Sequence, residues 1–110
     1  MDFPLPRLRG GKLVGQILWA DSFGNLITNI TREKYGKLLK DGRLQIEGRG
    51  WRVDRIQETY GEGRAGQPLA LFGSAGFLEL AVNRGNAREI LGMKPGDGVT
   101  IDLGGKRKNR

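Results

Sequence analysis

Short apolar runs separated by glycine-containing turns are the feature that most limits what this chain can fold into. Glycine makes up 19 of the 110 residues, against about 7% in an average protein. The glycines follow no Gly-X-Y repeat, and they fall between runs rich in apolar and β-branched residues. Such spacing is typical of tight turns that join short strands. The pattern therefore favours an all-β fold.

Seven runs have the length and composition of strands: residues 12–20, 25–30, 43–47, 51–59, 68–72, 77–82 and 99–103. The runs 43–47 and 51–59 alternate apolar with polar side chains on either side of a glycine turn, which predicts a half-buried antiparallel hairpin. In the run 77–82, alternation turns Glu79 away from the face that Leu78 and Leu80 share, so Glu79 is expected to point outward.

Two short helices are expected between the strands. Thr31 can cap a helix over residues 32–40. Asn86 can cap a second helix of one or two turns, because Glu89 follows three residues later and Gly92 can end it. Parallel crossovers need longer helices, so the elements fit an antiparallel barrel or sandwich better than a βαβ fold. We predict a small antiparallel β-barrel of about seven strands with two short helices.

The chain has the length of one domain, and its charge is concentrated at its ends. Lys and Arg outnumber Asp and Glu by 19 to 12, which gives a net charge of +7. Residues 104–110 hold four basic side chains and no acid, whereas residues 13–103 hold 12 basic and 11 acidic ones. We expect residues 1–11, with two prolines and two glycines, to be an extended linker. Residues 12–103 are then the folded domain, and residues 104–110 a basic tail.

Composition excludes several classes of function. The chain has no histidine and no cysteine, so disulfides, thiolate nucleophiles, zinc sites with the usual ligands and imidazole acid–base chemistry are absent. No run approaches the roughly 20 apolar residues of a membrane span, and residues 1–12 lack the apolar core of a secretory signal. We expect a cytoplasmic protein without a membrane partner. A nearly neutral domain also argues against a nucleic-acid partner.

Two sequence segments, taken together and in order, carry a family resemblance. They are DSFGNLITNI (21–30) and PLALFGSAGFLELAVNRGNAREILGMKPGDGVTI (68–101), with ETYGEG (58–63) between them. Either segment alone is compatible with an ordinary turn. Together they resemble the C-terminal domain of the S-adenosylmethionine hydrolase (hydroxide adenosyltransferase) family, whose superfamily includes fluorinating and chlorinating enzymes. The resemblance runs from about residue 12 to residue 103.

The resemblance implies that this chain is one half of a substrate site. Family members place an α/β domain before the barrel, and that domain supplies the ribose-binding aspartate and the groups that activate water or bind halide. S-adenosylmethionine lies between the α/β domain of one subunit and the barrel of its neighbour in a homotrimer. Hydroxide attacks the ribose carbon bonded to the sulfonium and releases adenosine and methionine, without a cofactor. No catalytic residue is therefore expected in this chain, and the chain alone is expected to be inactive.

Four residues match family positions that contact the adenine and the methionine ammonium. Asp21 matches the aspartate that pairs with the ammonium, although an aspartate here can also simply cap the turn. Phe23 matches the aromatic residue of the adenine pocket, the alternative being a core phenylalanine. Asn25 matches the residue that binds the adenine edge, and Tyr60 matches the aromatic residue that covers the base.

Four further residues complete the implied site. Ser74 matches the serine that binds the methionine carboxylate, and the backbone N–H of Ala75 adds a second donor. Backbone groups between Val82 and Arg84 match those that complete adenine recognition. Halogenating relatives carry arginine at the positions of Ala75 and Val82, so both differences favour hydroxide as the nucleophile. We expect Asp21, Phe23, Asn25 and Ser74 to form a shallow pocket at one rim of the barrel.

Two other functions remain open at this point. Small barrels often bind single-stranded RNA, and residues 106–110 (KRKNR) could contact phosphates. The chain could also be an oligomerisation module without catalytic activity, which does not conflict with the family interpretation.

Overall fold

The two most apolar runs of the sequence form the middle of a coiled sheet. The computed structural model describes residues 3–40, 44–60 and 64–104. β2 (Lys12–Ala20) pairs antiparallel with β3 (Leu26–Thr31), and the other strands extend the sheet on both sides. These are β1 (Arg7–Arg9), β4 (Gln45–Gly48), β5 (Trp51–Val53), β6 (Ile56–Gln57), β7 (Pro68–Phe72), β8 (Phe77–Val82) and β9 (Gly98–Asp102).

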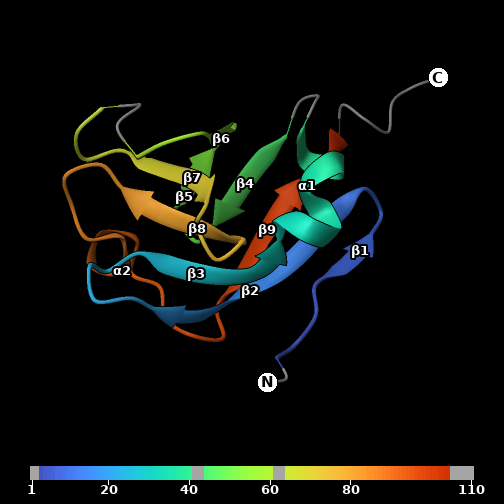
Figure 1. The fold of residues 1–110 in the computed structure, drawn as a ribbon, viewed down its shortest axis with the longest axis horizontal. Helices are drawn as coiled ribbons and strands as arrows, with labels where there is room; N and C mark the ends of the chain where they lie inside the picture. Colours follow the sequence, from blue (N-terminus) through green and yellow to red (C-terminus); the bar gives the residue numbers. More distant parts are fainter. Residues whose placement is uncertain (1–2, 41–43, 61–63, 105–110) are drawn as a thin grey trace.

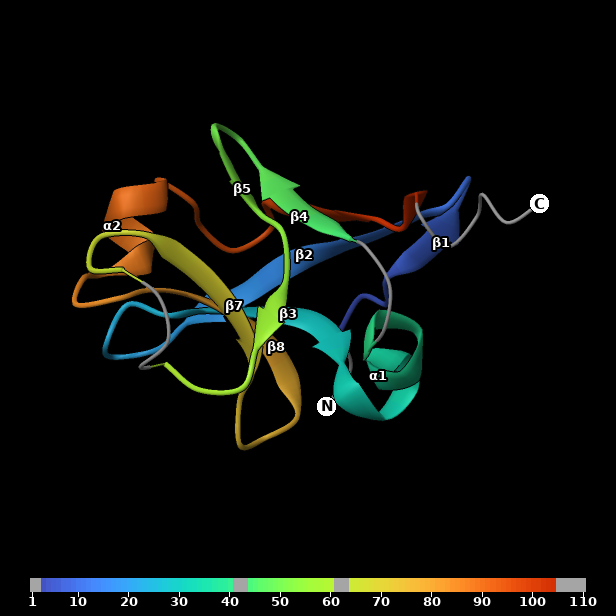
Figure 2. The same cartoon turned by 90° about the horizontal axis from the view of Figure 1, so that it is seen from above.

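The strand order closes the sheet into a nearly complete barrel. The order is β5-β4-β9-β2-β3-β8-β7-β6, with β1 beside β2. β5 and β6 stand at the two ends of this order, yet only Asp54 and Arg55 separate them in the sequence. The chain itself therefore joins the two edges of the sheet (Figures 1 and 2). The predicted all-β barrel is confirmed.

The run 51–59 is not the single antiparallel strand that alternation predicted. It breaks after Val53, and Ile56 pairs in parallel with Ala70 of β7. The break has a physical reason. After β5 the chain leaves the edge formed by β4 and β5 and crosses to β7, and it runs in the same direction as β7 when it reaches it. Alternation reports which side a residue faces, and it carries no information about such a change of partner.

One face of the strands fills the barrel with apolar side chains. Leu26, Leu80 and Ala70 occupy one row across β3, β8 and β7, and all three are buried in the main core. Ile27 and Glu79 form the next row and therefore face outward. A second, small cluster of buried side chains lies on the outer face of β7 and β8: Leu69, Leu71 and Ala81.

Both predicted helices are present and capped as expected. α1 (Arg32–Lys40) begins after Thr31, whose hydroxyl accepts a hydrogen bond from the Lys34 N–H at 3.3 Å. α2 (Ala87–Leu91) begins after Asn86, whose side chain accepts from the Glu89 N–H at 3.0 Å. α2 ends at Gly92, which has the left-handed backbone conformation that commonly ends a helix. In the described residues no helix is long and apolar enough to cross a membrane.

β3 is irregular on both of its edges. Between Ile17 and Trp19, β2 has one residue more than β3 opposite it, and between Ile27 and Thr31, β3 has two residues more than β8. Such bulges bend a strand and increase its twist, which helps a sheet to coil. Two buried polar side chains of β3, Thr28 and Asn29, occupy this irregular stretch.

The polar side chains of the bulge replace missing backbone hydrogen bonds. The Thr28 hydroxyl donates to the Leu78 carbonyl at 2.8 Å and accepts from the Ile30 N–H at 3.1 Å. The Asn29 side chain accepts from the Gln16 N–H at 2.9 Å and donates to the Pro4 carbonyl at 2.8 Å. Buried backbone groups that would otherwise be unpaired are thus satisfied.

The described part of the predicted linker packs against the barrel. Residues 3–6 have no regular secondary structure, whereas Arg7–Arg9 of the predicted linker pairs with β2 as β1. The Phe3 ring meets the Phe77 ring edge-on at 5.7 Å. At the other end, Gly104 is the last described residue, so residues 105–110 of the predicted tail lie outside the described part of the chain.

Gly15→Ala should lower the free energy of unfolding by about 1–3 kcal/mol, the usual cost of overpacking. A Cβ at Gly15 would stand 2.5 Å from Asn29 Oδ1 and 2.9 Å from the Ile30 side chain, against the bulge of β3. Gly36→Ala in α1 is the matched control: its Cβ would stand 3.1 Å from Cγ of Arg32, an exposed flexible side chain that can shift, so the helix preference of alanine should stabilise by up to about 1 kcal/mol. Urea unfolding of both variants measures this, and equal stabilities would contradict the account of the bulge.

Candidate functional site

Asp21 organises the turn between β2 and β3. Its Oδ1 atom accepts hydrogen bonds from the N–H groups of Phe23 and Asn25, both at 2.9 Å. The Asn25 side-chain amide also donates to Asp21 Oδ2 at 3.4 Å. Two backbone bonds close the turn: Asp21 N–H to the Asn25 carbonyl and Gly24 N–H to the Asp21 carbonyl. The local capping role of Asp21 is therefore realised.

Phe23 projects from this fixed turn into solvent. Its side chain is 77% exposed, so the alternative of a core phenylalanine is wrong. The turn below it is held in place by α2. Gly24 has a φ of +88°, its carbonyl accepts from the Arg88 N–H at 2.8 Å, and a Cβ there would overlap the Asn86 side chain. A rigid backbone thus presents an exposed aromatic ring, which is the form a binding residue takes.

The segment after β8 lies beside the same turn, because Leu26 pairs with Leu80. Val82 is 4% exposed, so its side chain belongs to the core, and its carbonyl accepts from the Gly85 N–H. The backbone of Asn83 bonds to residues 66 and 67. Arg84 is exposed and has a φ of +59°. Of Val82 and Arg84, the two predicted site residues in this segment, only Arg84 has a side chain that is exposed to solvent.

Ser74 and Ala75 lie at the far end of β3. They are exposed in the loop 73–76, which leads into Phe77, the partner of Thr31. The turn 21–25 precedes the start of β3, near α2, whereas α1 follows the end of β3 (Figure 1). The structure therefore does not bring the two turns to one rim, as the sequence predicted. It places them at opposite ends of the β3–β8 pair, and a ligand touching both must extend along these strands.

Tyr60 and Glu79 lie between the two turns. The Tyr60 hydroxyl donates to Glu79 Oε1 at 2.8 Å. Glu79 stands on the outer face of β8, and its carboxylate lies directly against Gly73, where a Cβ would overlap it. Sequence reasoning placed Glu79 outward but assigned it no role. Its signal was an acidic residue inside an otherwise apolar strand.

Burial and negative charge raise the pKa of Tyr60 to about 12. Burial of the phenol contributes most, followed by the hydrogen bond to Glu79 and the charges of the Glu79 and Asp21 carboxylates. Each of these disfavours the phenolate. Tyr60 therefore remains a protonated donor at neutral pH.

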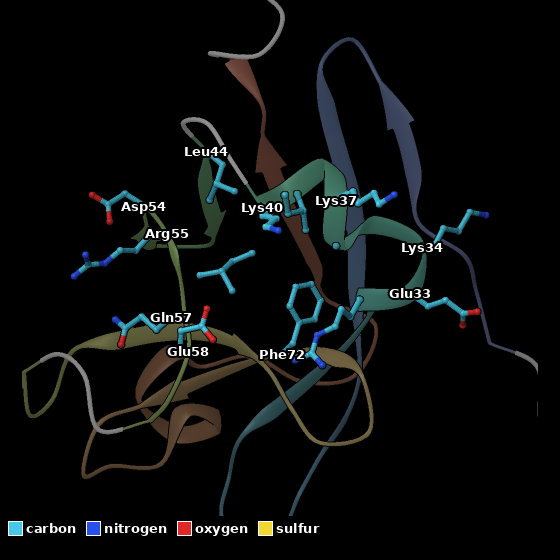
Figure 3. Close-up of a pocket in the computed structure, with 14 residues that line it drawn as sticks. Glu33, Lys34, Lys37, Lys40, Leu44, Asp54, Arg55, Gln57, Glu58 and Phe72 are labelled. Atoms are coloured by element: carbon cyan, nitrogen blue, oxygen red, sulfur yellow. The ribbon is translucent and has the colours of Figure 1, made fainter.

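A cavity of about 930 Å³ lies elsewhere, between α1 and the strand segment 54–58 (Figure 3). Phe72 stands between these two elements, and the Arg32 guanidinium lies 5.3 Å from the centre of its ring. A smaller hollow is lined by residues of the β4–β5 hairpin. Neither is lined by any of the eight predicted site residues.

Comparison with known proteins agrees with the sequence resemblance. The model of the family described as SAM hydroxide adenosyltransferase C-terminal domain matches residues 15–100. A Thermus thermophilus protein named (R)-S-adenosyl-L-methionine hydrolase is 48% identical over 87 residues, covering 79% of this chain and 31% of the relative. A Salinispora tropica protein of the same name is 30% identical and covers 94% of this chain and 38% of the relative. The chain thus spans about a third of the length of these relatives.

Solved structures have the same fold. A crystal structure of an uncharacterised conserved protein from Thermotoga maritima matches with a TM-score of 0.77 and 30% identity, over 93% of this chain and 40% of that one. A crystal structure of a conserved hypothetical protein from Thermus thermophilus matches with a TM-score of 0.69 and 42% identity, over 92% of this chain and 39% of that one.

Asp21→Ala should lower the free energy of unfolding by about 1–2 kcal/mol, because two backbone N–H groups of the turn lose their acceptor. Asp21→Asn keeps the Oδ1 acceptor and should stay within about 0.5 kcal/mol of the wild type. Ser22→Ala, at an exposed position of the same turn, is the control. Urea unfolding measures all three, and an Asp21→Ala variant as stable as the wild type would refute the role of Asp21 in the turn.

Proposed function

Because this chain belongs to the SAM hydroxide adenosyltransferase C-terminal domain family, we propose that it is the substrate-binding part of an S-adenosylmethionine hydrolase. The observation that carries the proposal is the 48% identity to a protein named (R)-S-adenosyl-L-methionine hydrolase, over 79% of this chain. The names of the relatives favour this interpretation over RNA binding, and residues 105–110, on which RNA binding depended, lie outside the described residues.

The adenine end of the substrate lies at the turn 21–25 in this proposal. Phe23 offers an exposed aromatic face, and the side chain of Asn25 offers the amide that a purine edge requires. Tyr60 covers the base from the outer face of β8, to which its hydroxyl is bonded through Glu79. Backbone groups of the segment 82–84 lie next to the turn and complete this end of the site.

The methionine end is bound by polar groups of both turns. Ser74 and the N–H of Ala75 are exposed in the loop 73–76 and bind the carboxylate. Asp21 provides negative charge for the ammonium while its Oδ1 atom remains bonded to the turn. A charge-assisted contact to the free part of this carboxylate is compatible with its structural role.

The reaction is attack of hydroxide on the ribose carbon next to the sulfonium, which forms adenosine and methionine. Such a displacement depends on positioning and on a nucleophile removed from bulk water. This chain contributes positioning, and the nucleophile-activating groups come from the part of the relatives that this chain does not span. The substrate is held without a cofactor. Ala75 and Val82, in place of the arginines of halogenating relatives, fit hydroxide as the nucleophile.

The proposal includes an assembly. The substrate is closed in by an α/β domain of a neighbouring subunit in a homotrimer, and the enzyme acts in the cytoplasm. The exposed ring of Phe23 supports this arrangement, because a large apolar side chain at the tip of a rigid turn is suited to being covered by a ligand or a neighbouring domain.

The purified chain should release no adenosine from S-adenosylmethionine above the uncatalysed rate. A chimera in which it replaces the matching third of the Thermus thermophilus hydrolase should hydrolyse S-adenosylmethionine. Chromatographic detection of adenosine and methionine measures both, with the Thermus protein lacking that third as the control. An inactive but folded and correctly assembled chimera would overturn the proposal, as would steady turnover by the chain alone.

A further inference from the structure

Three residues near the outer face of β8 form a chain of contacts that runs from Tyr60 to the loop 73–76. Tyr60 comes from the segment after β6, Glu79 from the middle of β8, and Gly73 from the loop that carries Ser74. The Tyr60 hydroxyl is bonded to one oxygen of Glu79, and the other oxygen lies against Gly73. Glu79 is thus in contact with both neighbours at once.

Glycine at position 73 is what permits this contact. A Cβ there would overlap Glu79 Oε2, and Gly73 has no left-handed backbone conformation that would itself require glycine. Gly73 is also buried, with its N–H bonded to the Phe77 carbonyl at 2.9 Å and its carbonyl accepting from Gly76. The Glu79 carboxylate therefore lies against a fixed part of the loop, and this contact determines the position of the carboxylate.

We propose that Glu79 is a positioning residue of the substrate site, which fixes the Tyr60 ring over the outer face of β8 and links it to the loop that carries Ser74. The inference rests on the proposed function, because Tyr60 and Ser74 are the groups that meet the two ends of the substrate. Tyr60 is 46% exposed and follows a strand of two residues. The bond to Glu79 restrains the exposed ring and reduces the entropy lost when the ring orders on the base.

Ionisation of Tyr60 reports this contact without any ligand. The chain has two tyrosines, so a Tyr35→Phe background leaves Tyr60 as the only titrating phenol. With a pKa of about 12, few Tyr60 side chains are ionised at pH 10.5. In that background Glu79→Ala should raise the ionised fraction at pH 10.5 at least about fivefold, because the hydrogen bond and a nearby negative charge are lost.

Absorbance at 295 nm measures the ionised fraction, and circular dichroism at the same pH shows that the chain is folded. Should the chain unfold below pH 10.5, the nuclear Overhauser contacts between the Tyr60 ring and residue 79 at pH 7 give the same information. Glu33→Gln, an exposed carboxylate of α1, is the control and should change neither readout. Tyr60 ionisation that is unaffected by Glu79→Ala would overturn the inference.

Gly73→Ala is an independent variant that changes no charge. The new methyl group must displace the Glu79 carboxylate. Tyr60 should therefore ionise more readily, although the Glu79 side chain is still present. Combining Gly73→Ala with Glu79→Ala removes the overlap and should restore the stability that Gly73→Ala alone loses. A Gly73→Ala variant with the Tyr60 ionisation of the wild type would contradict the proposed link to the loop.

Kinetics of the chimera test the consequence for substrate. Glu79→Ala should raise KM for S-adenosylmethionine about fivefold and change kcat less than about twofold. Glu79→Gln keeps an acceptor for the Tyr60 hydroxyl and should remain within about twofold of the wild type in both constants. An active chimera with unchanged KM in Glu79→Ala would overturn the inference and leave the proposed function standing. An inactive chimera would overturn the proposed function, and with it the substrate role of Glu79.

Discussion

The bulged stretch of β3 is the constraint on which the rest of this structure depends. β3 pairs with β2 on one edge and β8 on the other, and it is out of register with both around Thr28 and Asn29. A bulge leaves backbone groups unpaired in the middle of a sheet, and burying them unpaired costs about 1–3 kcal/mol each. Thr28 and Asn29 satisfy these groups with their side chains, and Asn29 also holds the segment before β1. The bend allows the sheet to coil. The turn 21–25 leads into β3, and the loop 73–76 of the neighbouring β7–β8 hairpin lies at the other end of β3.

The candidate site shows how stability and binding use the same residues. Asp21 closes its turn, and the closed turn leaves Phe23 exposed at its tip. Gly24 packs against the cap of α2, so the turn cannot move independently of the barrel. On the outer face of β8, Glu79 connects Tyr60 to the opposite loop. Phe23 and Tyr60 are therefore both held by neighbouring residues of the fold, as a pre-organised site requires.

The sequence predicted the elements and the barrel well, and the partners of the edge strands poorly. Capping residues and apolar periodicity are local signals. The sequence therefore predicted the bounds of α1 and the residues that cap α2, Asn86 and Gly92. The parallel partner of β6 and the pairing of β1 depend on which strands meet in space, and no local pattern encodes that. The separation of the turns along β3 follows from the register of β3 and β8. The contact of Glu79 with Tyr60 joins residues that are 19 apart in the sequence. The motif residues supplied the candidate site, and the fold showed where each of its residues lies.

Where adenosine binds on this chain is the most direct test of the account. Backbone amide shifts recorded during titration of the isotope-labelled chain should change at residues 21–25 and 82–84, with a dissociation constant on the order of millimolar, because much of the ligand stays in water. Inosine, whose base edge differs, should bind more weakly than adenosine, and Asn25→Ala should abolish the difference. Equal shifts for both nucleosides in the wild type, or shift changes confined to the cavity beside Phe72, would contradict the assignment of this turn as the adenine site.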